Sequence, residues 1–330
     1  MPEIKCEFDL ELDDVCDHIR RKGYRTVGIQ LPEGLKSHGL ELAERIEGET
    51  NATVLLDADP CWGACDLADH RLKELGAEFL VHYGHAPLPL PTEIPARFVE
   101  ARSTVDVRPV VREALPLLPH KRVGLVTTVQ HAHRIPEVEA FLAEQGVKPV
   151  IGYSKTRARG QVLGCDLTAA TSIAKESEGY LYIGSGNFHP LGIALATDLP
   201  VLIADPCANE VRGIEELKDR VLRQRYTAIA LAGEAKTMGI IVGTKKGQQQ
   251  PAMAKRFKKE AESRGCKAYL IAASELRPER LTFKVDVWVC TACPRVAIDD
   301  YSLYHQPILT PQEAEVALGI RPLESVYGLD

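Results

Sequence analysis

The chain has 330 residues, with 40 Lys and Arg against 46 Asp and Glu, and its formal charge is -6. A chain of this length is expected to form two or three domains, each large enough to bury a core. The 45% of hydrophobic residues is typical of a globular protein, and the acidic balance excludes a general nucleic-acid binder, which needs a strongly basic face. Because no apolar run reaches the ~18 residues that cross a bilayer and the acidic N-terminus is unlike a targeting peptide, we expect a cytoplasmic protein without membrane contact.

The first third of the chain predicts short strands that alternate with helices. The runs YRTVGIQ and EFLVH are apolar without strict alternation, as in strands buried on both faces. Amphipathic stretches between such runs favour helical crossovers in a parallel sheet. The expected strands are residues 24–30, 52–56 and 78–82, and the expected helices are residues 37–46 and a segment from after Cys65 to Leu75.

The same pattern recurs twice further along the chain. Its second copy has expected strands at 122–127, 148–151 and 179–183 with a helix at 137–144, and its third has strands at 237–243, 267–272 and 285–290 with a helix at 253–264. We therefore predict an α/β fold of three similar parallel-sheet units packed around a central cleft. The units are expected at residues 1–105, 106–208 and 209–330, with boundaries in the segments 100–108 and 209–225.

Chemically distinctive residues gather in the loops that follow the predicted strands. Ligands of parallel α/β sheets bind outside the carboxyl ends of the strands, so these loops are the expected functional region. They are residues 57–66, 82–85, 161–166, 184–189 and 290–295. One cysteine-bearing loop falls in each unit, and the three are expected to converge on a central point.

Nine cysteines are many for such a chain. In a reducing compartment they are not expected to form a disulfide framework, and free cysteine commonly serves as a small buried hydrophobe. The spacings Cys61-x3-Cys65 and Cys290-x2-Cys293 also suit a metal centre, such as a closed zinc site with four ligands. Cys290 and Cys293 suit a redox pair as well. Spacing alone leaves these alternatives open.

Several motifs, in order along almost the whole chain, resemble those of the archaeal diphthamide-synthesis enzymes, the 2-(3-amino-3-carboxypropyl)histidine synthases. They are QLPEGL at 30–35, GAC at 63–65, LVHYGH at 80–85, LGC at 163–165 and TACPR at 291–295. The family's cluster ligands lie in the GAC, GC and CPR contexts, so the resemblance implies that Cys65, Cys165 and Cys293 hold a 4Fe-4S cluster. Cys61 and Cys290 are then bystanders.

The resemblance also implies an activity. Thiolates are the usual ligands of iron–sulfur clusters, and a cluster held by three of them has one iron open to S-adenosylmethionine. Members of this family transfer the 3-amino-3-carboxypropyl group of S-adenosylmethionine to C2 of a histidine of translation elongation factor 2, through a cluster-generated radical, and release methylthioadenosine. This is the first step of diphthamide synthesis. A homodimer and a separate electron donor are expected, without direct nucleic-acid binding.

Residues beyond the cysteines are candidates for a cofactor pocket, and each has a structural alternative. Glu33 suits a contact with the nucleoside or a helix N-terminus, and Arg295 suits a bidentate contact with the substrate carboxylate or a backbone contact. His82 and His85 either line the pocket or are buried and satisfied. The candidate set for cofactor binding is Gln30, Pro32, Glu33, Gly34, His85, Gly186, His189, Asp205 and Arg295.

Two further motifs are expected to be surface features. The pair His131 and His133 resembles a metal clamp, but on a polar loop we expect an exposed segment. The run GTKKG at 243–247 lacks the ending of a phosphate loop and is expected to be a turn with exposed lysines. A zinc-stabilised scaffold without catalytic activity and an iron–sulfur electron carrier stay open as alternative functions.

Overall fold

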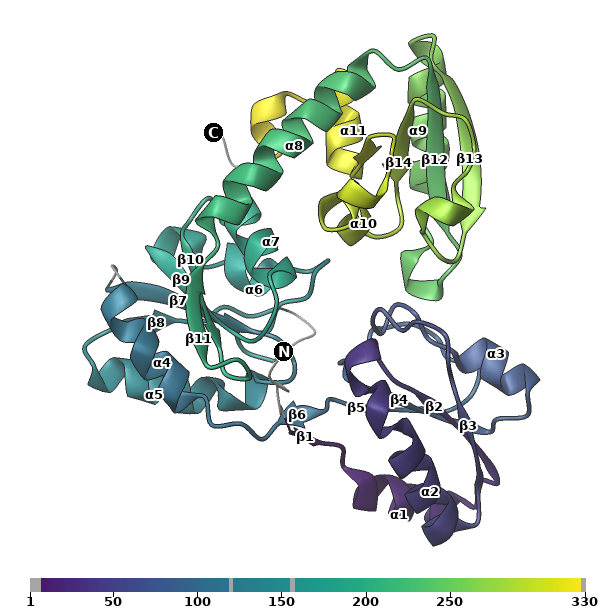
Figure 1. Ribbon diagram of the computed structural model, residues 1–330, viewed down its shortest axis with the longest axis vertical. Coiled ribbons are helices and arrows are strands. Elements are labelled where there is room, and N and C mark those ends of the chain that lie inside the picture. The colour runs from purple at the N-terminus through teal and green to yellow at the C-terminus, as the bar shows by residue number, and fades with distance from the viewer. Residues whose placement is uncertain (1–6, 119–120, 155–157, 328–330) are drawn as a thin grey trace. The chain divides into compact units, whose positions relative to one another are not determined.

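The computed structural model describes residues 7–118, 121–154 and 158–327 (Figure 1). The chain divides into two compact units. The first comprises Met1–Asp106, Val129–Arg134 and Lys245–Gly247, and the second comprises Val107–Thr128, Ile135–Thr244 and Gln248–Asp330. No helix among the described residues combines the length and the apolar character needed to cross a lipid bilayer.

The first unit is built on a four-stranded parallel sheet. Its elements are β1 (Phe8–Asp9), α1 (Leu12–Lys22), β2 (Thr26–Gln30), α2 (Gly39–Thr50), β3 (Thr53–Leu56), α3 (Asp69–Glu74), β4 (Phe79–Tyr83), β5 (Ala96–Val99) and β6 (Arg102–Ser103). The sheet has the order β3-β2-β4-β5, and β1 pairs separately with β6. Helices α1 and α2 bury Ile19 and Ile46 against one face of the sheet, while α3 buries Leu72 against the other. The apolar runs are thus strands covered on both sides.

The N-terminal part of the second unit contains a five-stranded sheet. Its elements are α4 (Arg108–Ala114), β7 (Arg122–Thr127), α5 (Ile135–Glu144), β8 (Lys148–Val150), α6 (Thr168–Thr171), β9 (Gly179–Ile183), α7 (Phe188–Thr197), β10 (Val201–Asp205) and β11 (Glu210–Gly213). The order is β11-β10-β9-β7-β8, with β11 antiparallel to β10. Tyr180 and Tyr182 face the cluster that includes α6 and α7, whereas Leu181 faces α4 and α5.

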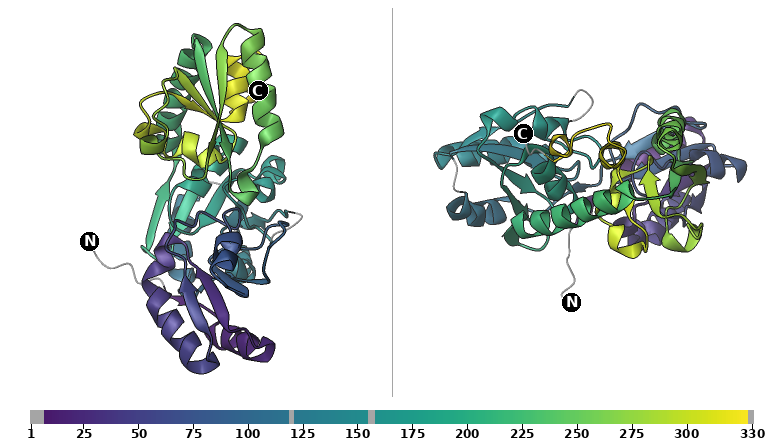
Figure 2. Two further views of the ribbon diagram at one scale, coloured as in Figure 1. Left: turned by 90° about the vertical axis from the view of Figure 1, so that its right-hand side faces the viewer. Right: turned by 90° about the horizontal axis from the view of Figure 1, so that it is seen from above.

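The C-terminal part of the second unit contains another four-stranded parallel sheet. Its elements are α8 (Glu215–Gly233), β12 (Thr237–Gly243), α9 (Pro251–Ser263), β13 (Lys267–Ala273), β14 (Val287–Cys290), α10 (Pro294–Ile298), β15 (Ile308–Leu309) and α11 (Pro311–Ala317), in the sheet order β13-β12-β14-β15. Figure 2 shows α9 running alongside these strands. Helices α8, α9 and α11 share an apolar cluster on one face of the sheet. Trp288 packs with α10 in a second cluster on the other face.

The three larger sheets share one order for their first three parallel strands. β2 lies between β3 and β4, β7 lies between β8 and β9, and β12 lies between β13 and β14. This order places a topological switch point beside the carboxyl end of each central strand, where ligands of doubly wound sheets bind. The α/β architecture with similar parallel-sheet units is therefore confirmed. The division into three domains at 1–105, 106–208 and 209–330 stays a prediction.

A glycine occupies the matching position of each central strand. A Cβ at Gly124 would lie 2.4 Å from the Tyr180 ring, and one at Gly239 would lie 2.4 Å from the Trp288 ring. In each case the aromatic residue is the paired residue of the neighbouring strand. The glycine therefore makes room for a large side chain on the same face of the sheet.

The segment 209–225, expected to be a domain boundary, is regular structure that contains β11 and the first half of α8. Its last residue, Arg225, is 1% exposed and forms an ion pair with Glu313, in which Nη2 lies 2.6 Å from Oε2. Arg225 also donates to the backbone carbonyls of Ala297 and Ile308, both at 2.6 Å. These buried contacts join α8 to the C-terminal sheet, which the charged sequence of the segment did not indicate.

Candidate functional site

Cys65 lies in the loop between β3 and α3, and Gln30 fastens this loop from the end of β2. The Gln30 amide nitrogen donates to the backbone carbonyl of Asp66 at 2.6 Å, and its oxygen accepts from the backbone N–H of Ala68 at 3.1 Å. The Gln30 side chain is completely buried. Its amide satisfies polar groups of the turn on both sides of Leu67, so it holds the backbone that follows Cys65 in one conformation.

Two lysines bind acidic residues that follow Cys65. Lys245 Nζ lies 2.6 Å from Asp66 Oδ2, and Lys246 Nζ lies 2.8 Å from Asp69 Oδ2. The expectation of a turn with exposed lysines is therefore wrong. Asp66 and Asp69 are buried, and buried carboxylates need a cation or hydrogen-bond donors. Burial raises the pKa of Asp66 even though Lys245 acts to lower it. In the sequence, the only signal for this contact is the opposite charge of Lys245 and Asp66, which lie 179 residues apart.

The backbone of Gly247 touches Cys65 directly. Its N–H donates to the Cys65 carbonyl at 3.0 Å. A Cβ at Gly247 would lie 2.5 Å from both the Cα and the Cβ of Cys65. Only glycine fits at this approach without displacing the loop.

A histidine pair follows β4 and meets Gln30. His82 Nδ1 lies 2.9 Å from Gln30 Oε1, and His82 Nε2 lies 3.0 Å from His85 Nδ1. Burial lowers the pKa of His82 well below its usual value and lowers that of His85 to about 4. The Sγ of Cys61 completes a group whose ligand atoms all lie within 4.8 Å of one another. His82 is thus buried and hydrogen-bonded, one of the two alternatives that the sequence left open.

The turn at residues 32–34, which follows β2, packs against the turn at residues 82–85, at the end of β4. Gly84 has a φ of +81°, and a Cβ there would lie 2.9 Å from Cγ of Pro32. Glu33 opens the short 3-10 helix Glu33–His38 and is exposed. Lys36 binds Glu33 at 2.6 Å and also donates to the carbonyls of Ala58 and Asp59, which lie in the Cys65 loop. Gly34 is exposed, with no heavy atom within 4 Å of where its Cβ would be.

Cys165 lies at the tip of a tight turn in the second unit. Leu163 and Asp166 form an isolated antiparallel bridge around it. A Cβ at Gly164 would lie 1.9 Å from the ring of Phe188, so the turn requires glycine beside the cysteine. Cys165 itself is exposed.

Cys293 precedes the first residue of α10, and the first turn of this helix approaches the Phe188 ring. The guanidinium carbon of Arg295 lies 5.0 Å from the centre of the Phe188 ring, and Arg295 Nε lies 3.1 Å from Asp299 Oδ2. The Phe188 ring therefore lies between two predicted site segments, the Gly164 turn and the start of α10, and contacts both. The structure thus brings the Cys165 and Cys293 segments of the second unit to one ring.

The loops after β9 and β10 are joined through Asp205. Its Oδ1 accepts from Ser185 Oγ at 2.7 Å and from the backbone N–H of Cys207 at 3.0 Å. Gly186 is exposed and has a φ of +78°. His189 stands at the start of α7, with its ring stacked 6.3 Å from that of Tyr182. The Asp205 carboxylate therefore holds the loop together.

Accessibility divides the described cysteines into two groups. Cys65 and Cys293 are partly exposed and Cys165 is exposed, whereas the other free thiols in the described part of the chain are buried: Cys16, Cys61, Cys266 and Cys290. Cys207 forms a disulfide bond. The three cysteines predicted from family motifs are thus the accessible thiols among the described residues.

The segment with His131 and His133 differs from its expectation. His131 is 4% exposed, although His133 is exposed. The neighbouring Gln130 donates through Nε2 to the carbonyl of Gly84 at 2.7 Å. The segment Val129–Arg134 therefore packs as part of the first unit. The prediction of an exposed segment is therefore wrong for His131.

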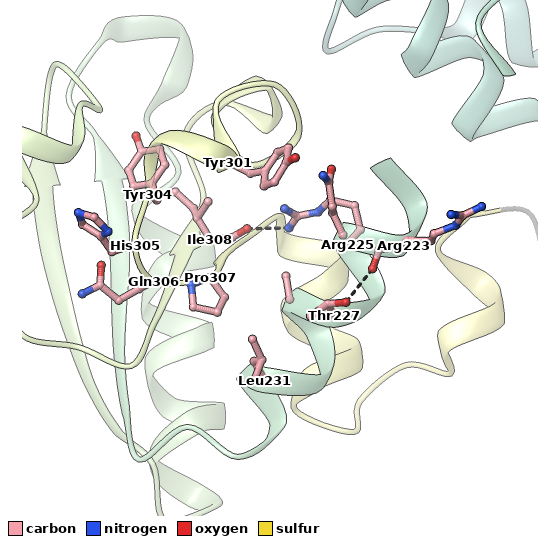
Figure 3. A pocket seen from close by; sticks show the side chains of 12 residues that line it. Arg223, Arg225, Thr227, Leu231, Tyr301, Tyr304, His305, Gln306, Pro307 and Ile308 are labelled. Carbon is pink, nitrogen blue, oxygen red and sulfur yellow. Dashed lines mark hydrogen bonds between the residues drawn. The ribbon is translucent and has the colours of Figure 1, made fainter. Parts of the chain in front are cut away.

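A pocket of about 350 Å³ lies in the second unit, away from all the predicted site residues (Figure 3). It is bordered by α8, including Arg225 and Leu231, and by the loop from Tyr301 to Ile308. Figure 3 shows the guanidinium of Arg225 bonded to the Ile308 carbonyl at its edge. Arginine, glutamine, tyrosine and histidine side chains line it together with a few apolar ones, and none of the candidate cysteines or histidines does.

Comparisons with known proteins agree with the motif resemblance. The model of the diphthamide synthesis protein family matches residues 31–327. The chain is 39% identical over 319 residues to the 2-(3-amino-3-carboxypropyl)histidine synthase of Pyrococcus horikoshii, covering 95% of this chain and 91% of that protein. It is 31% identical over 335 residues to subunit 1 of the Homo sapiens synthase, covering 98% of this chain and 75% of that subunit.

The fold is also similar to a solved structure. The crystal structure of Dph2 from Pyrococcus horikoshii with a 4Fe-4S cluster matches with a TM-score of 0.88 and 37% sequence identity. The match covers 95% of this chain and 92% of that chain.

Proposed function

Because the chain belongs to the diphthamide synthesis protein family, we propose that it transfers the 3-amino-3-carboxypropyl group of S-adenosylmethionine to a histidine of translation elongation factor 2. The name of the Pyrococcus relative supports the transferred group and the histidine acceptor. The elongation factor as substrate, attack at C2 of its histidine and a radical route are part of the same proposal, as are a homodimer and an electron donor.

We propose that Cys65, Cys165 and Cys293 hold a 4Fe-4S cluster. The observation that supports this best is their accessibility, because the other described free thiols are enclosed by protein atoms. Each of the three also follows a parallel strand, namely β3, β8 or β14. Thiolates are the donors that iron–sulfur clusters require, so this donor set fits the group named for the related Pyrococcus structure.

When bound, a cluster of this kind supplies the electron that cleavage of a sulfonium carbon–sulfur bond requires. The residues around the proposed ligands supply rigidity. Gln30 and Lys245 fasten the backbone on the C-terminal side of Cys65, and Gly247 binds the Cys65 carbonyl itself. Fixed ligand loops matter because a misplacement of about 1 Å can slow a positioned reaction by on the order of 100-fold.

The candidate cofactor residues fall into three groups by their exposure and by what they already contact. Glu33, Gly34 and Gly186 are exposed and can meet a ligand directly. Gln30 and Asp205 are engaged in holding loops, so we propose that they position the pocket. For the remaining candidates, Pro32 packs at Gly84, His85 bonds His82, His189 stacks on Tyr182 and Arg295 pairs with Asp299.

Arg295 is the proposed contact for the carboxylate of S-adenosylmethionine. Its side chain is 43% exposed and forms an ion pair with Asp299, in which Nε lies 3.1 Å from Oδ2. Burial raises the pKa of Asp299 to about 6. A guanidinium can bind a substrate carboxylate through two parallel hydrogen bonds.

Anaerobic reconstitution with iron and sulfide tests the proposal. With S-adenosylmethionine, a reductant and the elongation factor, we expect methylthioadenosine and a modified histidine. Cys65→Ala, Cys165→Ala and Cys293→Ala should each lose iron and product, whereas Cys266→Ala, which removes a buried thiol, should keep both. Full iron loading in Cys165→Ala would contradict the ligand set.

The same preparation separates the alternative functions. A colourless protein that contains zinc but no iron supports the scaffold. A brown protein that shows no heat of binding with S-adenosylmethionine supports the electron carrier.

A further inference from the structure

A second set of metal-binding groups lies in the first unit. The Sγ of Cys61 and one ring nitrogen each from His82 and His85 all lie within 4.8 Å of one another. We propose that Cys61, His82 and His85 bind a zinc ion at a site distinct from the three accessible cysteines. This proposal uses none of the cluster ligands and does not rest on the proposed function, although it gives His85, a candidate for the cofactor pocket, the role of a zinc ligand.

The hydrogen bonds of Gln30 determine which nitrogen of His82 is free to bind a metal. The Gln30 nitrogen donates to the Asp66 carbonyl, and the Gln30 oxygen accepts from the N–H of Ala68. The atom that faces His82 Nδ1 at 2.9 Å is this oxygen, so Nδ1 must carry the hydrogen. His82 Nε2 therefore presents a lone pair, and it points toward His85 Nδ1.

This arrangement is the one that zinc-binding histidines commonly use. A histidine that binds a metal through one nitrogen usually donates its other N–H to a carboxylate or carbonyl, which orients the ring and fixes its tautomer. Gln30 supplies such a carbonyl oxygen from a completely buried side chain. The ring of Phe98, 5.2 Å from that of His82, adds an apolar neighbour.

The donor set and its spacing suit zinc. Zinc takes nitrogen and sulfur ligands in a tetrahedron, with bonds of about 2.0–2.3 Å, so neighbouring donor atoms lie roughly 3.3–3.6 Å apart. The two histidine nitrogens, 3.0 Å apart, are slightly closer than this, and the whole group is within 4.8 Å. Without a metal, His85 Nδ1 donates its hydrogen to the lone pair of His82 Nε2. Zinc binding therefore requires His85 to take its other tautomer, with the hydrogen on Nε2, and requires the side chains to rotate to bonding distance.

Protonation is compatible with binding. Both imidazoles are neutral near pH 7 because burial lowers their pKa, and neutral imidazole is the ligand form. Burial raises the pKa of the Cys61 thiol to about 12, so without a metal it keeps its proton. On binding, a Zn–S bond forms as the S–H proton passes to solvent, and zinc provides the positive charge that a buried thiolate needs.

Elemental analysis of the full-length chain, purified anaerobically with its cluster loaded, tests the site. After dialysis against a small excess of Zn²⁺ and then against buffer, we expect about one zinc per chain in the wild type. Cys61→Ala and His85→Ala should lose this zinc. The controls are Cys16→Ala, which removes another buried thiol of the first unit, and Cys165→Ala, which removes a proposed cluster ligand, and both should keep it.

Thermal unfolding provides a second test, which does not depend on the amount of zinc per chain that remains after purification. A ligand that binds the folded state raises its stability, so a zinc chelator should lower the Tm of the wild type but not that of Cys61→Ser. Retention of zinc in both Cys61→Ala and His85→Ala, or its loss in Cys165→Ala, would overturn the proposal. A wild type that holds no zinc and shows no chelator response would overturn it as well.

Discussion

Lys245 donates a 2.6 Å hydrogen bond to the carboxylate of Asp66, and the two side chains expose only 10% and 4% of their surface. Asp66 is the residue after Cys65, whose own carbonyl accepts a hydrogen bond from Gly247 at 3.0 Å. One short segment therefore fastens the chain at two consecutive positions. This pairing links the rigidity of the Cys65 loop to a distant part of the sequence.

Removal of Lys245 should destabilise the first unit in a pH-dependent way. Lys245→Met leaves the Asp66 carboxylate buried without its cation, at a cost of about 1–3 kcal/mol near neutral pH. Burial already raises the pKa of Asp66, and loss of the lysine raises it further. A raised carboxyl pKa favours the fold below the unfolded value of about 3.9, and this contribution is lost as pH rises through the folded value. The deficit should therefore shrink on acidification.

Urea unfolding of wild type and Lys245→Met at neutral and acidic pH measures this effect. Arg264→Met is the control, because its pair with Glu260 is exposed and should change stability by less than about 1 kcal/mol. An equal loss in the two variants, or a loss that does not vary with pH, would show that the ion pair contributes nothing particular.

A methyl group at position 247 should disturb the Cys65 loop. In Gly247→Ala the new Cβ would lie 2.5 Å from two atoms of Cys65, so the loop must move. We expect reduced iron per chain after reconstitution and an overpacking cost of about 1–3 kcal/mol. Gly48→Ala is the matched control, since its Cβ meets nothing within 4 Å in α2. Wild-type iron content in Gly247→Ala would mean that the loop tolerates the shift.

The contact between Gly164 and Phe188 should appear as a coupling between two substitutions. Gly164→Ala alone places a Cβ 1.9 Å from the Phe188 ring and should lower the Tm. Phe188→Ala removes the obstructing ring, so adding Gly164→Ala to that variant should cost little. A double-mutant cycle in thermal unfolding gives the coupling energy. Additive effects would refute the steric explanation.

The buried ion pair between Arg225 and Glu313 should dominate the stability of the C-terminal sheet. Arg225→Met leaves Glu313 as an uncompensated buried charge and should cost about 3–5 kcal/mol. The double variant Arg225→Met/Glu313→Leu should lose less, because both charges are gone. Arg223→Met changes an exposed arginine of the same helix and serves as the control in denaturant unfolding. A double variant less stable than Arg225→Met would contradict this account.

Strands and helices with strong apolar patterns could be predicted closely. The strands at 122–127, 179–183 and 237–243 have the predicted bounds, because each is an unbroken buried run between turn residues. Short edge strands such as β5 and β15 were missed, since two to four residues carry too little periodicity. The charged sequence of 209–225 does not indicate that α8 packs tightly, because the partner that buries Arg225 lies 88 residues away.

The predicted cluster cysteines came from motifs, and their environments could not be derived from the sequence. Nothing near Cys61 or Cys290 in the chain distinguishes them from Cys65 and Cys293, yet the first two are buried and the last two partly exposed. Likewise, the lysines of GTKKG have the composition of a solvated turn, and only the buried carboxylates that they meet make them structural.

The sequence by itself determined the repeating α/β pattern, the motif positions and the family resemblance, because these depend on neighbouring residues and their spacing. Tertiary structure decided which charges are neutralised, which thiols reach the surface and which histidine nitrogen is free. Those properties depend on burial and on partners from distant segments, since the energy of a polar group is set by the groups that surround it in space.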